Sequence, residues 1–149
     1  MLLIFVCTGN TCRSPMAAAI AKRLSEGRFE AASAGLCALS GSPPSPNAKK
    51  AMAKRGLSLE GHRASQLSRK DLADAYLVLT MTQSQKQELN NLHPEFSDKV
   101  FTLAEFADSG RDVADPYGKS EAHYDMCADA LESLIQKAVE KLDRQSDIL

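Results

Sequence analysis

Tryptophan is absent from the 149 residues of this chain, and the chain has neither a long apolar run nor a run of like charges. Its 18 basic and 19 acidic residues nearly cancel, which disfavours nucleic-acid binding but allows one local anion site. No stretch approaches the roughly 20 apolar residues of a membrane span. The apolar start, residues 1–7, is too short for a signal peptide. We therefore expect a cytoplasmic protein that binds neither nucleic acid nor membranes.

Cysteine is scarce and irregularly spaced. The four cysteines, at positions 7, 12, 37 and 127, lack the paired spacing of a zinc site. In a reducing cytoplasm they would remain thiols, which favours chemistry or burial over a disulfide framework. None of the three histidines is spaced for a metal or for a Cys–His pair, although His62 is a candidate support residue. We expect no metal and no cofactor.

Apolar runs and turn residues alternate along the chain. The runs predict strands at residues 2–6, 29–34, 76–81 and 100–102, and helical spacing predicts helices at 15–25, 47–55, 68–74, 84–92 and from Ser120 onward. Pro15 suits the first position of the first helix, and Asn47 can cap the second. The 41–46 stretch, rich in proline and serine, is a surface loop.

The last predicted helix has one apolar face, which should cover the sheet. That face consists of Tyr124, Cys127, Leu131, Leu134, Ala138 and Leu142. Strands that alternate with helices imply right-handed crossovers between parallel strands. We expect one domain, residues 1–149, with a three-layer α/β fold of the Rossmann-like kind, in which a central four-stranded parallel sheet has helices on both faces.

The loop after the first strand is the candidate site, because ligands of such folds bind beyond the carboxyl ends of the strands. Gly9 permits a left-handed backbone, so the loop amides can curl around an anion, and the following helix directs its positive end at the same point. The loop lacks the lysine and spacing of a Walker phosphate loop, which disfavours nucleotide triphosphates. The expected phosphate-binding residues are Thr8, Gly9, Asn10, Thr11, Cys12 and Ser14.

Cys7 begins this loop and Arg13 ends it. A thiol and a rigid guanidinium with several N–H donors therefore reach the same anion site. A cysteine at a strand end is by itself more often a core residue. No packing argument, however, asks for an arginine at a buried helix start. Amides, helix dipole and arginine would together favour a thiolate nucleophile, and the guanidinium would clamp two phosphoryl oxygens.

Residues 6–17, VCTGNTCRSPMA, resemble the signature of low-molecular-weight protein-tyrosine phosphatases. Segments 33–35, 61–64, 76–81 and 115–117 are also similar to that family, so the resemblance spans nearly the whole chain. It implies phosphatase activity through a phosphocysteine on Cys7. It also implies that Asn10 braces the loop through Ser33, that Ser14 contacts the Cys7 sulfur, and that Cys12 can form a reversible disulfide with Cys7.

Such a reaction needs a proton donor for the leaving group. Composition alone describes residues 115–118, Asp-Pro-Tyr-Gly, as an ordinary turn before the last helix. The family's Asp-Pro-Tyr motif instead makes Asp115 the general acid, and later the base that activates water. Tyr117 would form a wall of the cleft. No metal is needed in this scheme.

Features of the substrate site resemble the bacterial protein-arginine-phosphatase branch of the family. Thr11 stands where tyrosine-specific members usually have a branched aliphatic residue, and Gly118 replaces a second aromatic. Residues 36–40 lack the aromatic that commonly lines an aryl pocket, and Thr82 replaces an aspartate found in many members. We expect phosphorylated proteins as substrates, with phosphoarginine favoured over phosphotyrosine, and a monomer by default.

Two other functions remain open at this point. An arsenate reductase would share the fold and the anion loop but needs further cysteines to relay a disulfide, and Cys37 and Cys127 are poorly placed for that. A phosphoprotein-binding module without activity would need the cradle alone. The presence of Asp115 disfavours such a module, because binding does not require an acid.

Overall fold

The sheet is central to the fold and consists of four parallel strands. The structure, a computed structural model, describes residues 1–148. The strands are β1 (Leu2–Cys7), β2 (Glu30–Gly35), β3 (Leu77–Thr80) and β4 (Val100–Thr102), in the order β2-β1-β3-β4. β1 lies between two neighbours and is buried on both faces, which explains its continuous apolar sequence. The predicted four-stranded parallel sheet is confirmed.

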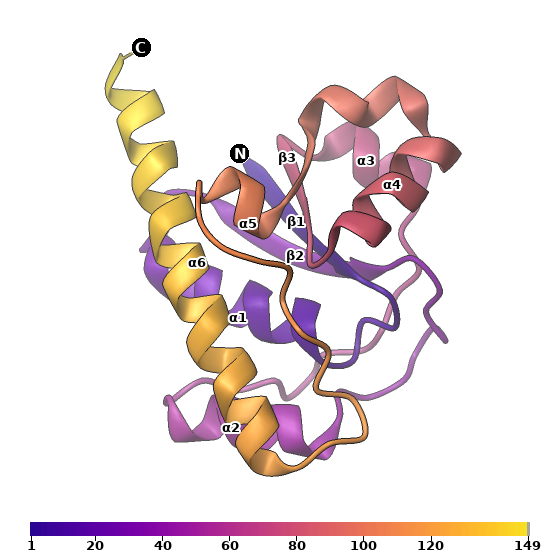
Figure 1. The fold of residues 1–149 in the computed structure, drawn as a ribbon, viewed down its shortest axis with the longest axis vertical. Coiled ribbons are helices and arrows are strands. Elements are labelled where there is room, and N and C mark those ends of the chain that lie inside the picture. The colour runs from indigo at the N-terminus through magenta and orange to yellow at the C-terminus, as the bar shows by residue number, and fades with distance from the viewer. Residues whose placement is uncertain (149) are drawn as a thin grey trace.

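Helices cover both faces of the sheet (Figure 1). They are α1 (Arg13–Ser25), α2 (Pro46–Lys54), α3 (Arg69–Asp74), α4 (Gln83–Leu92), α5 (Leu103–Phe106), α6 (Glu121–Ile148) and the 3₁₀ helix η1 (Pro94–Lys99). Side chains of β1 alternate between two cores. Leu3 and Phe5 pack in one core with residues of α1, α2 and α6, whereas Ile4 and Val6 pack in the other with residues of α3 and α4. The three-layer α/β prediction is confirmed.

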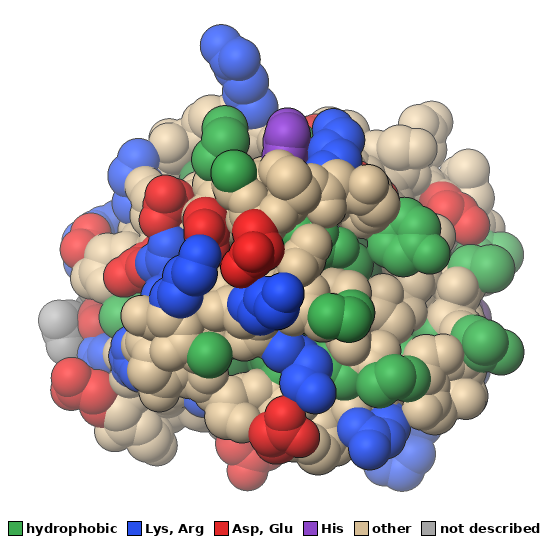
Figure 2. Space-filling model, turned by 90° about the horizontal axis from the view of Figure 1, so that it is seen from below, with side chains coloured by type: hydrophobic (Ala, Val, Ile, Leu, Met, Phe, Trp, Pro, Cys, Tyr) green, Lys and Arg blue, Asp and Glu red, His purple; other side chains and the backbone are tan. Residues whose placement is uncertain are grey.

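The long helix α6 covers one face of the molecule as predicted, and all six residues of its expected apolar face are buried in the larger core. Its outer face pairs with α2: Lys54 contacts Asp125 at 2.9 Å, and Arg55 contacts Asp129 and Glu132. Figure 2, seen from below Figure 1, shows acidic and basic side chains next to one another on this face. No helix within residues 1–148 has both the length and the apolarity to cross a membrane.

The five predicted helix starts differ from the observed ones by one or two residues, and at α1 and α2 the difference changes the role of a predicted residue. α1 begins at Arg13, so Pro15 is its third residue; proline is tolerated there because the first four N–H groups of a helix have no acceptor within it. α2 begins at Pro46, and its cap is Ser45, whose hydroxyl accepts from the Ala48 N–H at 3.3 Å, rather than Asn47. The sequence analysis also missed η1 and α5, which are too short to show helical periodicity.

Candidate active site

The loop between β1 and α1 turns sharply at Asn10, whose φ is +59° and whose side chain is fully buried. The expectation that Gly9 supplies the left-handed residue is therefore wrong. Asparagine is among the few residues other than glycine that adopt this conformation readily. Its amide Nδ2 donates to Ser14 Oγ at 2.8 Å and to Ser33 Oγ at 3.0 Å. The predicted brace between Asn10 and Ser33 is present.

Residues far along the chain hold the other side of Asn10. Its Oδ1 accepts from the Ser65 N–H at 3.0 Å, and its carbonyl oxygen lies 2.9 Å from Nε2 of His62. His62 thus supports the loop by contacting the backbone of Asn10, which agrees with the support role expected of this histidine. The loop is fixed before any ligand binds, and its shape depends on three segments of the chain.

The sulfur of Cys7 lies at the centre of this loop. Cys7 Sγ is 2.9 Å from Ser14 Oγ and 3.3 Å from the Asn10 backbone N–H, which donates to it. Among the described residues, the backbone N–H groups of Gly9 and Thr11 have no protein acceptor. Together with the N-terminus of α1, these donors make the loop suitable for an anion.

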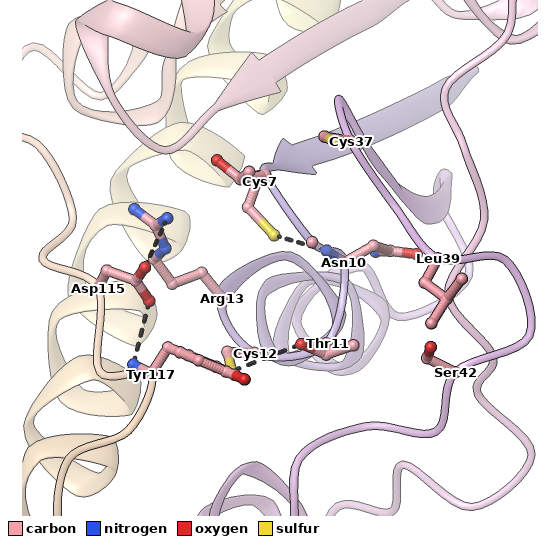
Figure 3. A pocket seen from close by; sticks show the side chains of 12 residues that line it. Cys7, Asn10, Thr11, Cys12, Arg13, Cys37, Leu39, Ser42, Asp115 and Tyr117 are labelled. Carbon is pink, nitrogen blue, oxygen red and sulfur yellow. Dashed lines mark hydrogen bonds and ion pairs between the residues drawn. The ribbon is translucent and has the colours of Figure 1, made fainter.

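Arg13 connects the loop with the segment that carries Asp115. Its guanidinium is buried, and Nη1 donates to the Val113 carbonyl at 3.0 Å. Nη2 lies 3.5 Å from Asp115 Oδ2, while the Tyr117 N–H donates to Asp115 Oδ1 at 3.1 Å. Figure 3 shows Arg13 and Asp115 pointing toward one another beside Cys7. The Asp115 side chain is 54% exposed, so a substrate can reach it.

One pocket of about 320 Å³ contains nearly all of the predicted site residues (Figure 3). Ser14 and Ser33 are the exceptions, since they support the loop from behind. Tyr117 lies on the Asp115 side of the opening, as expected of a cleft wall. The lining residues are Cys7, Thr8, Gly9, Asn10, Thr11, Cys12, Arg13, Cys37, Leu39, Ser42, Asp115 and Tyr117.

The sequence analysis did not place Cys37, Leu39 or Ser42 in the pocket. They come from the irregular segment after β2, where no periodicity or motif indicates which side chains face the site. The Cys37 N–H donates to the Thr8 carbonyl at 2.9 Å, which fixes this segment against the loop. Leu39 is 79% exposed in the structure, but the sequence alone does not reveal that exposure.

Of the other thiols, Cys12 and Cys127 are buried, whereas Cys37 is exposed. Cys12 Sγ lies 3.3 Å from Tyr124 Oη and 3.4 Å from Ser45 Oγ. Burial raises the pKa of Tyr124 to about 12, so its phenol stays neutral beside Cys12. Burial also raises the pKa of Cys127 to about 12, which leaves it a neutral core thiol as predicted. Within residues 1–148, no cluster of three or more His, Cys, Asp and Glu is placed to hold a metal ion.

Comparisons with known proteins agree with this geometry. The protein-arginine-phosphatase of Geobacillus stearothermophilus is 41% identical over 144 residues, covering 96% of this chain and 97% of that protein. A phosphatase structure from T. tengcongensis, described as a low molecular weight protein tyrosine phosphatase, is 44% identical with a TM-score of 0.91, covering 95% of this chain and 99% of the other.

A third relative is a cysteine-to-serine mutant of the YwlE arginine phosphatase with a phosphorylated active-site serine. It is 38% identical with a TM-score of 0.92 and covers 96% of each chain. A family model described as low molecular weight phosphotyrosine protein phosphatase matches residues 2–147. The chain therefore belongs to the low-molecular-weight protein-tyrosine-phosphatase family.

Proposed function

We propose that this chain is a phosphatase of protein side chains, with Cys7 as nucleophile, Arg13 as phosphate clamp and Asp115 as general acid and base. One observation carries the proposal: the Cys7 sulfur accepts from the Asn10 N–H in the same pocket that Arg13 and Asp115 line. A module that only binds phosphoproteins would need the phosphate-binding loop but not the Asp115 carboxylate. The phosphorylated active-site serine of the YwlE mutant supports a covalent intermediate.

In the first step the Cys7 thiolate attacks phosphorus, and an S–P bond forms as the bond to the leaving group breaks. Asp115 gives its proton to the leaving oxygen or nitrogen. Arg13 and the loop N–H groups stabilise the charge on the phosphoryl oxygens in the transition state. Because Nη2 of Arg13 is only loosely paired with Asp115, it can turn to the phosphoryl group.

In the second step the Asp115 carboxylate takes a proton from water, and the resulting hydroxide attacks phosphorus. The S–P bond breaks, inorganic phosphate leaves, and the thiolate of Cys7 is restored. The Ser14 hydroxyl, 2.9 Å from the sulfur, would stabilise the thiolate as leaving group. The cycle consumes one water and needs neither a metal nor an external reductant.

Phosphoarginine is the favoured substrate. Thr11 lines the pocket, and its hydroxyl, 3.8 Å from Cys12 Sγ, is a polar group that can accept from a substrate guanidinium. The segment opposite contributes Cys37, Leu39 and Ser42 but no aromatic ring, so an aryl group would gain little stacking there. Protein-arginine-phosphatases among the relatives fit this preference.

The substrate is tested by kcat/KM on matched phosphoarginine and phosphotyrosine peptides for the natural chain, Thr11→Ile and Thr11→Ser. The natural chain should prefer phosphoarginine, and Thr11→Ile should shift the ratio toward phosphotyrosine by about tenfold. Thr11→Ser keeps the hydroxyl and should leave the ratio nearly unchanged. A ratio that is the same in all three proteins would remove Thr11 from substrate selection.

The structure disfavours an arsenate reductase, because such an enzyme relays a disulfide through further thiols. Cys127 is buried and neutral, which makes it a poor relay. Cys37 lies in the pocket, so it is better placed than the sequence indicated. Turnover of p-nitrophenyl phosphate by the natural chain and by Cys37→Ser, without thioredoxin, separates the functions. A phosphatase should turn over p-nitrophenyl phosphate in both proteins, because its reaction needs neither Cys37 nor a reductant.

We also propose that residues 1–149 act as one catalytic domain, as a monomer, on phosphorylated proteins in the cytoplasm. The two cores on opposite faces of one sheet support a single domain. Sedimentation of the purified chain with and without substrate peptide tests the monomer, and a dimer at assay concentrations would contradict it.

A further inference from the structure

Gln85 is a buried polar residue in the first turn of α4, and both polar atoms of its side chain form hydrogen bonds. Its exposed fraction is 5%. The carbonyl Oε1 accepts from the N–H groups of Met81 at 3.0 Å and Thr82 at 3.1 Å. The amide Nε2 donates to Thr8 Oγ1 at 3.2 Å, and Thr8 belongs to the phosphate-binding loop. The residue thus joins the β3–α4 junction to the active site.

Helix capping accounts for the bond from the Thr82 N–H to Oε1 but not for the bond from Nε2 to Thr8. Thr82 and Gln85 form a capping box at the start of α4, in which Oε1 does all that the cap requires. A glutamate would serve that purpose equally well, since both residues occur at this position of capping boxes. In the bond to Thr8 the amide Nε2 is the donor, whereas a carboxylate at this position could only accept from the Thr8 hydroxyl.

The same junction also holds the segment before Asp115. The Met81 carbonyl accepts from the Val113 N–H at 2.9 Å, and the Gln83 N–H donates to Asp112 Oδ1 at 3.1 Å. Val113 in turn accepts from Arg13. The acid's segment is therefore anchored on residues 81–83, and Gln85 connects this stretch, through Met81 and Thr82, with Thr8 of the nucleophile's loop.

We propose that Gln85 is a positioning residue, which fixes the phosphate-binding loop relative to the Asp115 segment through its bond to Thr8. The proposal rests on the proposed phosphatase function. When the bond is lost, the loop can shift relative to the acid. The proton then reaches the leaving group less efficiently, so leaving groups that depend most on the acid should suffer most.

The variant Gln85→Glu keeps the cap but replaces the Nε2 donor by a carboxylate, so the natural bond to Thr8 is replaced by a reversed bond beside a negative charge. Gln87→Glu is the matched control, since Gln87 is exposed on the same helix and the change is chemically identical. We expect Gln85→Glu to unfold at nearly the natural temperature. It should lose about tenfold in kcat/KM on phenyl phosphate and clearly less on p-nitrophenyl phosphate, whose leaving group needs less help. Gln87→Glu should match the natural chain on both.

Thr8→Val removes the acceptor without adding a charge. If Gln85 acts through Thr8, this variant should show the same leaving-group dependence, and the double variant should be no worse than Gln85→Glu alone. Thr8 is exposed, so Thr8→Val should fold normally. This variant therefore tests the positioning role even if Gln85→Glu fails to fold.

Equal losses on both substrates, or no loss, in Thr8→Val would overturn the positioning role. Failure of the phosphatase proposal would differ visibly, because the natural chain itself would then hydrolyse neither compound.

Discussion

The Arg13 guanidinium contributes to the site in two ways. It faces the phosphate-binding loop, which leads into α1, and it bonds to the segment that carries Asp115. A buried guanidinium is stable only with such partners, and Val113 supplies one through its carbonyl. The arginine therefore brings the acid and the nucleophile together before substrate arrives. This arrangement predicts how each of the two charged residues fails when it is changed.

Asp115→Asn removes the proton donor and leaves the shape of the side chain. We expect kcat on phenyl phosphate to fall about a thousandfold, and kcat on p-nitrophenyl phosphate to fall much less. Steady-state assays on both substrates measure this difference, and an equal fall on the two would contradict the role of Asp115 as acid.

Arg13→Lys keeps the charge but replaces the planar fork by a point charge. The lysine cannot hold two phosphoryl oxygens and Val113 together, so we expect kcat to fall about a hundredfold or more. Binding of inorganic phosphate should weaken as well. Inhibition by phosphate and turnover of p-nitrophenyl phosphate test this, with the exposed Arg63→Lys as control. Nearly natural activity in Arg13→Lys would show that a positive charge alone suffices.

The sequence identified the chemistry-bearing residues of this site but not what shapes the loop around them. Gly9 was the natural candidate for the left-handed residue, because glycine adopts that conformation without steric cost. The structure gives this role to Asn10, whose side chain gains bonds to Ser33 and Ser65. Those partners lie more than twenty residues away, so spacing within the loop could not reveal them.

Among the elements, α5 shows how a very short helix is held. It has four residues, and Thr102 and Glu105 form a capping box at its start. The Thr102 N–H, which donates at 2.8 Å, holds the pKa of Glu105 at about 2, and Lys86 at 3.0 Å acts in the same direction. The carboxylate is favoured in the folded state, so its contribution to stability depends on pH.

Because the pKa of Glu105 is lowered on folding from 4.5 to about 2, its contribution should be complete above pH 4.5 and lost as pH falls toward 2. Glu105→Gln keeps an acceptor for the cap but has no charge, so its free energy of unfolding should fall less steeply over that interval. Urea unfolding at several pH values measures the slopes. The exposed Glu88→Gln serves as control and should keep the natural slope; identical slopes in Glu105→Gln and the natural chain would refute the linkage.

Elements with an apolar run or a clear helical period were predictable, whereas α5 and η1 were not. The strands and α6 carry enough apolar residues to show their period, as the six buried positions of α6 demonstrate. α5 and η1 complete about one or two turns and offer no repeat to detect. The start of α1 was misplaced at Pro15 because the loop runs directly into the helix at Arg13, without a side-chain cap.

At the scale of the whole molecule, both cores depend on one sheet, and α6 closes the larger of them. Leu131 is fully buried there. We expect Leu131→Ala to lower the free energy of unfolding by about 2–5 kcal/mol, through lost burial and the cavity left behind. Met126→Ala, on the exposed side of α6, should change stability by less than about 0.5 kcal/mol.

Urea unfolding of both variants provides this comparison, and p-nitrophenyl phosphate turnover under native conditions should stay nearly natural in each. Equal stability of the two would show that α6 contributes little to the core.

Alternating strands and helices were sufficient to predict the layered fold, since parallel strands with crossover helices have few other solutions. They were not sufficient to predict the pocket walls. Leu39 and Ser42 face the site because the segment after β2 folds back over the loop, which depends on contacts such as the Cys37 N–H bond to Thr8. Which side chains of this segment face the site could therefore be read only from the structure.

The proposed phosphatase reaction depends on a covalent bond between the Cys7 sulfur and phosphorus. Acid quenching of the enzyme within the first turnovers of a phosphoarginine peptide, followed by peptide mass spectrometry, tests this most directly. We predict one added phosphoryl group on the peptide that contains Cys7, lost on further incubation with water and absent in Cys7→Ala. Rapid turnover without any phosphorylated Cys7, or with the phosphoryl group on another residue, would contradict the account.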